Sequence, residues 1–163
     1  MNPTPTNVLF LSTGDAARGI MAEALLRHYG EDRFVAFSAG TAILPTVDPR
    51  TLSMLDDNGI YPYGFSPKNM MAFFESPRSI LVDVIVTLSD EARSLCPEWP
   101  GDPVRVHWPV DDPCVAASED EKDCKFRRCF DILQNRVHTL IKQRTPQSAI
   151  ELMFQLRSIA AVV

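Results

Sequence analysis

The residues best suited to chemistry form one short run, "STGDAARG" at positions 12–19, between four apolar residues and a helical pattern. A strand-to-helix turn of this kind presents unpaired backbone N–H groups at the positive end of the helix, where an oxyanion can bind. Arg18 could grip two oxygens of a tetrahedral anion with its planar guanidinium. The run therefore predicts an anion-binding loop, although a surface loop with an exposed arginine has the same spacing. The N–H groups would come from Thr13, Gly14, Asp15, Ala16, Ala17 and Arg18.

Ser12 stands where a nucleophile would attack the bound anion. A serine hydroxyl is a weak nucleophile at neutral pH and normally needs an adjacent base or a metal. The sequence identifies no such base. Asp15 adds a carboxylate, which only accepts hydrogen bonds and has the same charge as the anion. We therefore expect anion binding at this loop to be weakened.

The composition of the chain limits the classes of partner. At 163 residues and a net charge of −5, it is long enough for one domain, and it contains no Lys/Arg-rich tract. This argues against nucleic acid or an anionic membrane surface as a partner. No apolar run approaches the roughly 20 residues that a membrane helix needs. Residues 1–6 resemble no secretory signal and are predicted to be a disordered lead, so we expect a cytoplasmic protein.

The cysteines give no sign of a metal site or a disulfide framework. They form no C-x-x-C pair and no Cys/His zinc spacing. We therefore expect reduced thiols and no metal or other cofactor. The four residues are Cys96, Cys114, Cys124 and Cys129.

Strand-like and helical runs alternate along the chain, which predicts βαβ units and a parallel sheet with helices on both faces. The runs "VLFL" and "VDVIVTL" are apolar throughout, as expected for strands buried on both sides. Residues 146–163 predict one more amphipathic helix, either packed on the domain or offered to a partner. Strands are predicted at 7–12, 33–40, 81–89 and 104–108, and earlier helices at 20–29, 49–58 and 120–142.

Several motifs in order resemble the low-molecular-weight protein tyrosine phosphatase family, and specifically its thiol-linked arsenate reductase branch. They include "IMAEALLRHYG", "RFVAFSAGT", "DVIVTLSD", "CPEWPGDP" and "HWPVDDP". The resemblance covers about residues 7–143. It implies a flavodoxin-like three-layer α/β sandwich with a four-stranded parallel sheet and the anion site at the end of the first strand. It also implies phosphate, arsenate or sulfate as ligand, with thioredoxin, glutathione or another thiol system as reductant.

The resemblance also assigns roles to individual residues. Arg18 matches the anion-binding arginine and Asp112 the general acid, which protonates the leaving oxygen. Ser12 and Ser89 stand where the family has redox cysteines, while Cys96 keeps the third position of the relay. Hydroxyls cannot form the disulfides on which such a relay depends.

Two more positions of the loop differ from the family pattern, in which Asp15 would be asparagine and Gly19 would be serine or threonine. Three histories fit these departures. The chain could be a non-catalytic relative, a pseudoenzyme that binds an oxyanion or a protein partner. It could be a genuine reductase or phosphatase whose cysteines were changed to serine, or a serine-based phosphatase. Four departures around one site favour the first.

Overall fold

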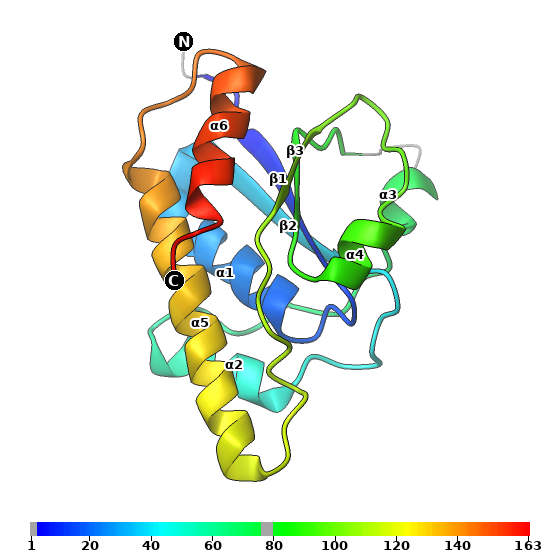
Figure 1. Cartoon of the computed structure of the whole chain (residues 1–163), viewed down its shortest axis with the longest axis vertical. Helices are drawn as coiled ribbons and strands as arrows, with labels where there is room; N and C mark the ends of the chain where they lie inside the picture. Colours follow the sequence, from blue (N-terminus) through cyan, green and yellow to red (C-terminus); the bar gives the residue numbers. More distant parts are fainter. Residues whose placement is uncertain (1–2, 76–79) are drawn as a thin grey trace.

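The computed structural model describes residues 3–75 and 80–163. Helices and strands alternate as predicted, and Figure 1 shows their arrangement. The strands are β1 (Thr6–Ser12), β2 (Phe34–Gly40), β3 (Val84–Thr87) and β4 (Val104–His107). The helices are α1 (Arg18–Gly30), α2 (Pro49–Asp57), α3 (Ala72–Glu75), α4 (Asp90–Leu95), α5 (Glu119–Lys142) and α6 (Ala149–Ile159), with a 3-10 turn at Glu31–Arg33.

The four strands form one parallel sheet in the order β2-β1-β3-β4, which confirms the predicted fold class. In the register of the sheet, Ser12 pairs with Gly40, Leu11 with Thr87, and Thr87 with His107. The carboxyl ends of all four strands therefore meet at one edge. In an open sheet of this kind, ligands bind at that edge.

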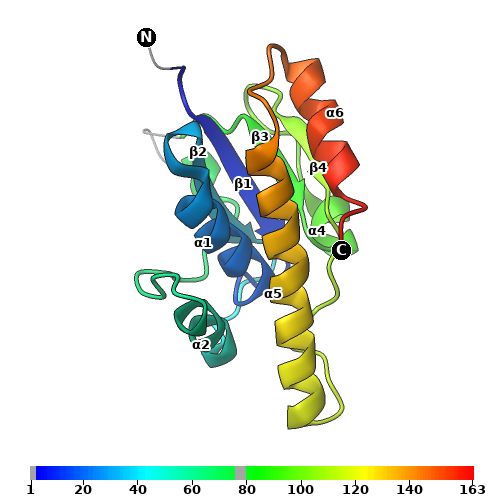
Figure 2. The same ribbon diagram turned by 90° about the vertical axis from the view of Figure 1, so that its left-hand side faces the viewer.

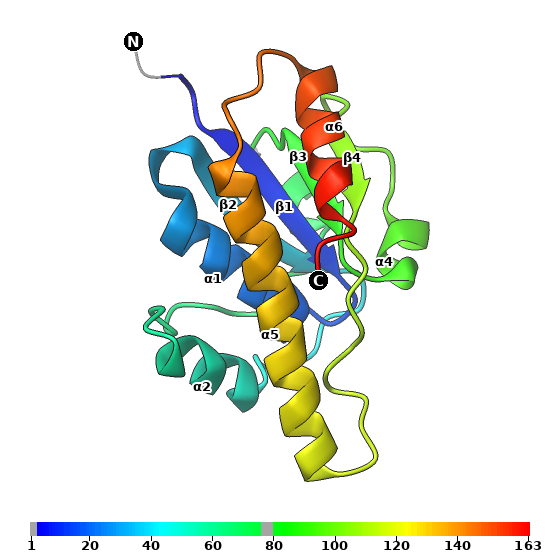
Figure 3. The ribbon, with the colours of Figure 1, turned by 60° about the vertical axis from the view of Figure 1, so that its left-hand side comes forward.

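Two separate apolar clusters cover the two faces of the sheet. Figures 2 and 3 look onto the face covered by α1, α5 and α6, where Phe10 packs with Phe126 and Phe130. On the opposite face, Leu9 and Ile85 pack with residues of α3, α4 and the segment that follows α4. Alternate residues of β1 thus enter different clusters, as expected for a strand buried on both sides.

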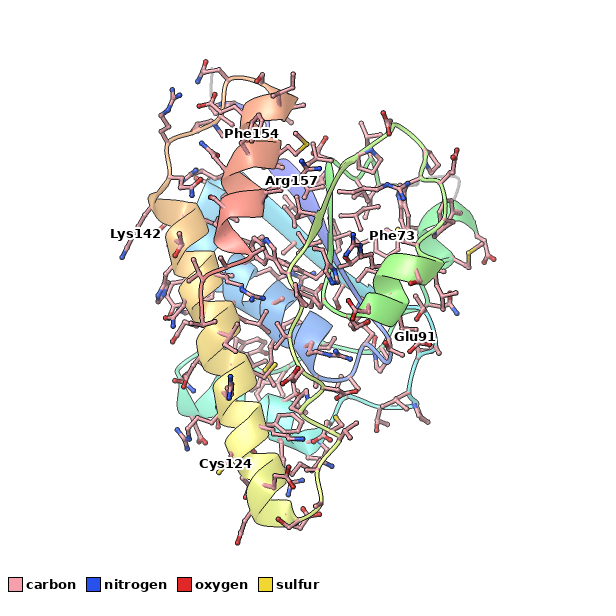
Figure 4. All side chains as sticks on the ribbon, in the orientation of Figure 1. Phe73, Glu91, Cys124, Lys142, Phe154 and Arg157 are labelled. Atoms are coloured by element: carbon pink, nitrogen blue, oxygen red, sulfur yellow. The ribbon has the colours of Figure 1, made fainter. Side chains whose placement is uncertain are left out.

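The C-terminal helix α6 packs against β4 and α5. Leu156 and Ile159 are buried, and the Trp108 indole donates a hydrogen bond to the Leu156 carbonyl at 2.9 Å. On the outer side of the same helix, Ile150 and Phe154 remain exposed, and Figure 4 shows Phe154 pointing away from the domain.

The sequence did not predict the two short helices on the second face, α3 and α4. Four and six residues are too few for a helical period to appear in the apolar pattern. Ser89 caps α4, because its Oγ accepts a hydrogen bond from Ala92 N at 3.1 Å. The predicted lead includes residues 1 and 2, which lie outside the described residues, and Thr6 already belongs to β1.

Among the described residues, none of the helices combines the length and apolar character that crossing a membrane requires. In the same part of the chain, no group of three or more His, Cys, Asp or Glu side chains is arranged to hold a metal ion.

Candidate functional site

The loop between β1 and α1 lies at the carboxyl edge of the sheet and leads directly into a helix of 13 residues. Ala17 precedes this helix and provides no side-chain cap. The first N–H groups of α1 therefore lack a side-chain partner, and the positive end of the helix dipole lies at the loop.

The neighbouring segment, residues 40–48, fixes which way the loop backbone faces. Its N–H groups donate to four carbonyls of β1 and the loop, the three from Ser12 to Gly14 and that of Ala16, at 2.9–3.1 Å. These contacts fix the orientation of the loop carbonyls, and of the loop N–H groups, that of Asp15 donates to Ser12 Oγ within the loop at 3.3 Å. Gly40 permits the close approach, since a Cβ there would lie 2.6 Å from the Thr13 carbonyl oxygen. The four donors are Thr41, Ala42, Leu44 and Asp48.

The structure brings Arg18 and Asp112 together, although 94 positions separate them in the sequence. The Arg18 guanidinium donates to the Val110 carbonyl at 2.9 Å and to Asp112 Oδ2 at 3.4 Å. Arg18 is 7% exposed, whereas the Asp112 side chain is 38% exposed. The predicted anion-binding cation and the predicted general acid therefore lie in contact at the helix end of the loop.

At the strand end of the loop, Ser12 is buried and its Oγ accepts a weak hydrogen bond from Asp15 N at 3.3 Å. Asp15 adopts a φ of 49°, a left-handed conformation that aspartate and asparagine tolerate better than most residues. Its carboxylate is 1% exposed and lies beneath the loop. Oδ2 accepts from Lys68 N at 2.8 Å and lies 3.6 Å from Lys68 Nζ, whereas Oδ1 has no hydrogen-bond partner.

Gly19 and Asp15 depend on each other geometrically. A Cβ at position 19 would lie 2.8 Å from Asp15 Oδ1 and 3.1 Å from Ser12 Oγ. A serine or threonine there would therefore displace the Asp15 carboxylate in its observed position. The two departures from the family pattern form one arrangement, which the sequence analysis treated as separate changes.

A second buried carboxylate, Glu23 of α1, lies in the same region. It accepts hydrogen bonds from Ser38 at 3.1 Å and from Arg27 at 2.9 Å. Burial raises the pKa of Asp15 to about 6, and the nearby Lys68 ammonium opposes this shift. Burial also raises the pKa of Glu23, opposed by Lys68 and Arg27. Near neutral pH, the base of the loop therefore holds a carboxylate whose protonation is easily changed.

Ser89, which the resemblance aligns with the second relay position, lies beside the loop. The hydroxyls of Ser89 and Thr13 are 3.1 Å apart, and Thr13 also donates to Glu91 at 3.3 Å. Figure 4 shows Glu91 on α4, near the loop that follows β1. His107 bridges Thr87 at 2.7 Å and Asp90 at 3.0 Å, which gives the ring a structural role at this edge.

Three cysteines, Cys96, Cys114 and Cys129, have a thiol pKa above the ordinary value, which favours the protonated form. Burial raises the pKa of Cys96, although Arg105 opposes the shift, and it raises that of Cys129 to about 12. Burial together with the carboxylates of Asp112 and Asp48 raises the pKa of Cys114 to about 11. Thiolate is the nucleophilic form, so these positions do not replace the missing sulfur at position 12. Cys124 is exposed on α5, and Figure 4 shows it far from the loop.

Sequence reasoning missed the groups beneath the loop. Glu23 gave a signal, as an acidic residue within the apolar run "IMAEALL". Lys68 and Ser38 gave none, because only the fold brings them to Asp15 and Glu23.

Comparison of the sequence and the structure with known proteins assigns the chain to a family. The model of the family described as low molecular weight phosphotyrosine protein phosphatase matches residues 7–149. The arsenate reductase of Halalkalibacterium halodurans is 31% identical over 133 residues, which cover 81% of this chain and 92% of that protein. The arsenate reductase structure from Archaeoglobus fulgidus has a TM-score of 0.64 and 26% identity, and the match covers 83% of this chain and 99% of that one.

A second similar structure is a Cys-to-Ser variant of YwlE arginine phosphatase from Bacillus subtilis, with a phosphorylated active-site serine. Its TM-score is 0.61 at 21% identity, with coverage of 85% of this chain and 98% of that one, so it supports the fold. The chain belongs to the low molecular weight phosphotyrosine protein phosphatase family, and arsenate reductases are among its relatives.

Proposed function

We propose that this protein binds a tetrahedral oxyanion, of the phosphate, sulfate or arsenate class, on the loop from Ser12 to Arg18. The orientation of the loop supports this proposal, since the segment 40–48 satisfies its carbonyls and leaves N–H groups beside the helix end. Arg18 adds the buried positive charge. The anion is bound despite the like charge of Asp15, which weakens the interaction without removing it.

We also propose that the protein does not perform the thiol-dependent turnover of an arsenate reductase. The observation that carries this part is the hydroxyl of Ser12 at the nucleophile position of the loop. A disulfide relay from the loop would need sulfur at positions 12 and 89, and Ser89 instead caps α4. Thioredoxin and glutathione are therefore expected to find no disulfide at this site.

One experiment tests both parts. Arsenate and sulfate should raise the melting temperature of the protein, because a ligand that binds only the folded state stabilises it. This increase should disappear in Arg18→Ala. In the same samples, arsenate with thioredoxin or glutathione should consume no more reductant than a blank. Sustained reductant consumption that Ser12→Ala abolishes would contradict the proposal, as would the lack of any thermal stabilisation.

A further inference from the structure

Three consecutive backbone carbonyls that follow β4 accept hydrogen bonds from two buried arginines. Arg136 of α5 donates through Nη1 to the Trp108 carbonyl at 3.1 Å and to the Pro109 carbonyl at 3.2 Å. Arg18 donates through Nη1 to the next carbonyl, that of Val110, at 2.9 Å. The two guanidinium groups therefore hold adjacent peptide groups of one short segment, residues 108–110.

The other side of the Arg136 guanidinium holds the segment that follows α6. Nε donates to the Val162 carbonyl at 2.9 Å, and Nη2 donates to the Ala160 carbonyl at 3.0 Å. The Trp108 indole joins the same two parts of the chain through the Leu156 carbonyl. Figure 3 shows α6 ending beside α5, which carries Arg136. One side chain thus fixes the C-terminal segment to residues 108–110.

The chemistry of Arg136 suits a geometric role. All three guanidinium nitrogens donate, and all four acceptors are backbone carbonyls. A buried charge is costly unless its donors are satisfied, and this side chain is 3% exposed. A planar guanidinium holds its acceptors in fixed directions, which the single ammonium of a lysine cannot do. Arg136 therefore sets the relative positions of the two segments that it joins.

We propose that Arg136 is a positioning residue for the oxyanion site, which acts through residues 108–110 on the Arg18 guanidinium. The inference rests on the proposed oxyanion binding. With Nη1 anchored on the Val110 carbonyl, Arg18 has fewer orientations to lose when an anion binds. Asp112, two residues further along, contacts Arg18 Nη2 at 3.4 Å and is placed by the same segment.

The same contacts give the C-terminal segment a part in the site. The match to the family model ends at residue 149, whereas α6 spans Ala149–Ile159 and its end is bound by Arg136. The support for Arg18 therefore includes a segment outside that match. Loosening α6 from residues 108–110 should weaken anion binding, although no residue of α6 lies in the loop.

The test is a calorimetric titration of the full chain with sulfate. Arg136→Gln should bind sulfate about 5-fold more weakly, which is within the range for residues that act through a neighbour. Arg136→Lys should lose about as much, because it keeps the charge but not the planar set of donors. Unchanged affinity in Arg136→Lys would show that only the charge matters and would overturn the positioning role.

The matched control is Arg33→Gln. Arg33 also donates to two carbonyls at the end of α5, those of Ile141 and Gln143, at 2.7 Å and 3.0 Å. It lies just before β2, at the edge of the sheet opposite the loop. This variant should lower the melting temperature but leave the affinity for sulfate unchanged. An equal loss of affinity in Arg33→Gln would show a general effect of destabilisation and would overturn the inference.

A double-mutant cycle tests whether Arg136 acts through Arg18. In the background of Arg18→Lys, Arg136→Gln should lower the affinity for sulfate by less than about 2-fold, because the side chain that it positions is already changed. Additive losses of affinity would overturn this route. Trp108→Phe is a milder variant, which keeps a buried ring and loses the bond to Leu156. It should weaken binding about 2-fold, and it replaces Arg136→Gln if that variant does not fold.

The NMR signals of the Arg18 side chain provide a measurement that needs no anion. Without sulfate, these signals should shift in Arg136→Gln and stay unchanged in Arg33→Gln. Sulfate binding with unchanged affinity and unchanged Arg18 signals in the Arg136 variants would overturn the inference and leave the proposed function intact. If sulfate does not bind the unmodified protein, the proposed function fails, and the Arg18 signals still decide whether Arg136 positions this side chain.

Discussion

The oxyanion loop has two ends, and they hold different kinds of chemical group. At the helix end, Arg18 contacts Val110 and Asp112, and both residues that the resemblance assigns to that end are present. Near the strand end, Ser12 and Gly19 replace the sulfur and the hydroxyl of the family pattern, and the Asp15 carboxylate borders the position that a side chain at Gly19 would occupy. Under the proposed function, anion binding and nucleophilic chemistry depend on separable parts of one loop.

The largest expected effect is on the rate of aryl phosphate turnover after Ser12 is replaced by cysteine. Ser12→Cys alone should turn over an aryl phosphate at least about 10-fold more slowly than the triple variant Ser12→Cys/Asp15→Asn/Gly19→Ser. The Asp15 carboxylate disfavours a thiolate at position 12, and Gly19 donates no hydrogen bond to it. Steady-state kinetics of the two variants provide the measurement. Equal rates would show that the strand end needs only sulfur.

A second prediction concerns Asp15, near the strand end of the loop, and the dependence of the free energy of unfolding on pH. Burial raises the pKa of Asp15 from 3.8 to about 6, so the folded state binds a proton more tightly than the unfolded state. The free energy of unfolding should therefore fall as the pH rises from about 4 to about 6, by up to about 3 kcal/mol from this residue. Asp15→Asn should lose this component. Urea unfolding across this pH range gives the answer, and identical curves for the two proteins would contradict it.

At the helix end, Arg18→Lys keeps the positive charge but loses the fork that can bind two oxygens. We expect the affinity for sulfate to fall about 10-fold, which corresponds to about 1.4 kcal/mol. Arg27→Lys is the matched control, because Arg27 lies on the same helix but pairs with Glu23. Calorimetric titration of both variants provides the comparison, and equal affinities would remove Arg18 from the site.

The smallest effect is expected at Ser89. Ser89→Ala should destabilise the protein by about 1 kcal/mol through the loss of the cap on α4. Ser118→Ala removes the corresponding cap of α5 and should cost a similar amount. Only Ser89→Ala should also shift the amide signals of the loop, through Thr13. Identical loop spectra in the two variants would show that Ser89 acts only as a cap.

The fold was largely predictable from the sequence, because buried parallel strands and long amphipathic helices leave strong apolar patterns. The Phe126 and Phe130 stripe of α5 is one example. The loop was predictable as well, since its residues are contiguous. The role of Gly19 could not be predicted, because the sequence does not show that the Asp15 carboxylate occupies the space beside this glycine. The contact between Asp15 and Lys68 joins residues 53 positions apart, and no local pattern encodes it.

The assignment of the chain to the phosphatase family is established, while several finer expectations stay predictions. These include the cytoplasmic location, the absence of a cofactor, and the choice among a pseudoenzyme, an altered enzyme and a serine-based enzyme. The shared geometry of Ser12, Asp15 and Gly19 bears on that choice, because coupled changes need fewer independent events than the sequence analysis assumed.

The most direct test of the account is a titration with sulfate that follows the amide NMR signals of residues 13–18. The account predicts saturable shifts centred on these residues, with tighter binding in Asp15→Asn because a like charge beneath the loop is removed. Saturable shifts should be absent in Arg18→Ala. If the loop amides do not respond to sulfate, or respond equally in Arg18→Ala, the loop is not an oxyanion site and the central claim fails.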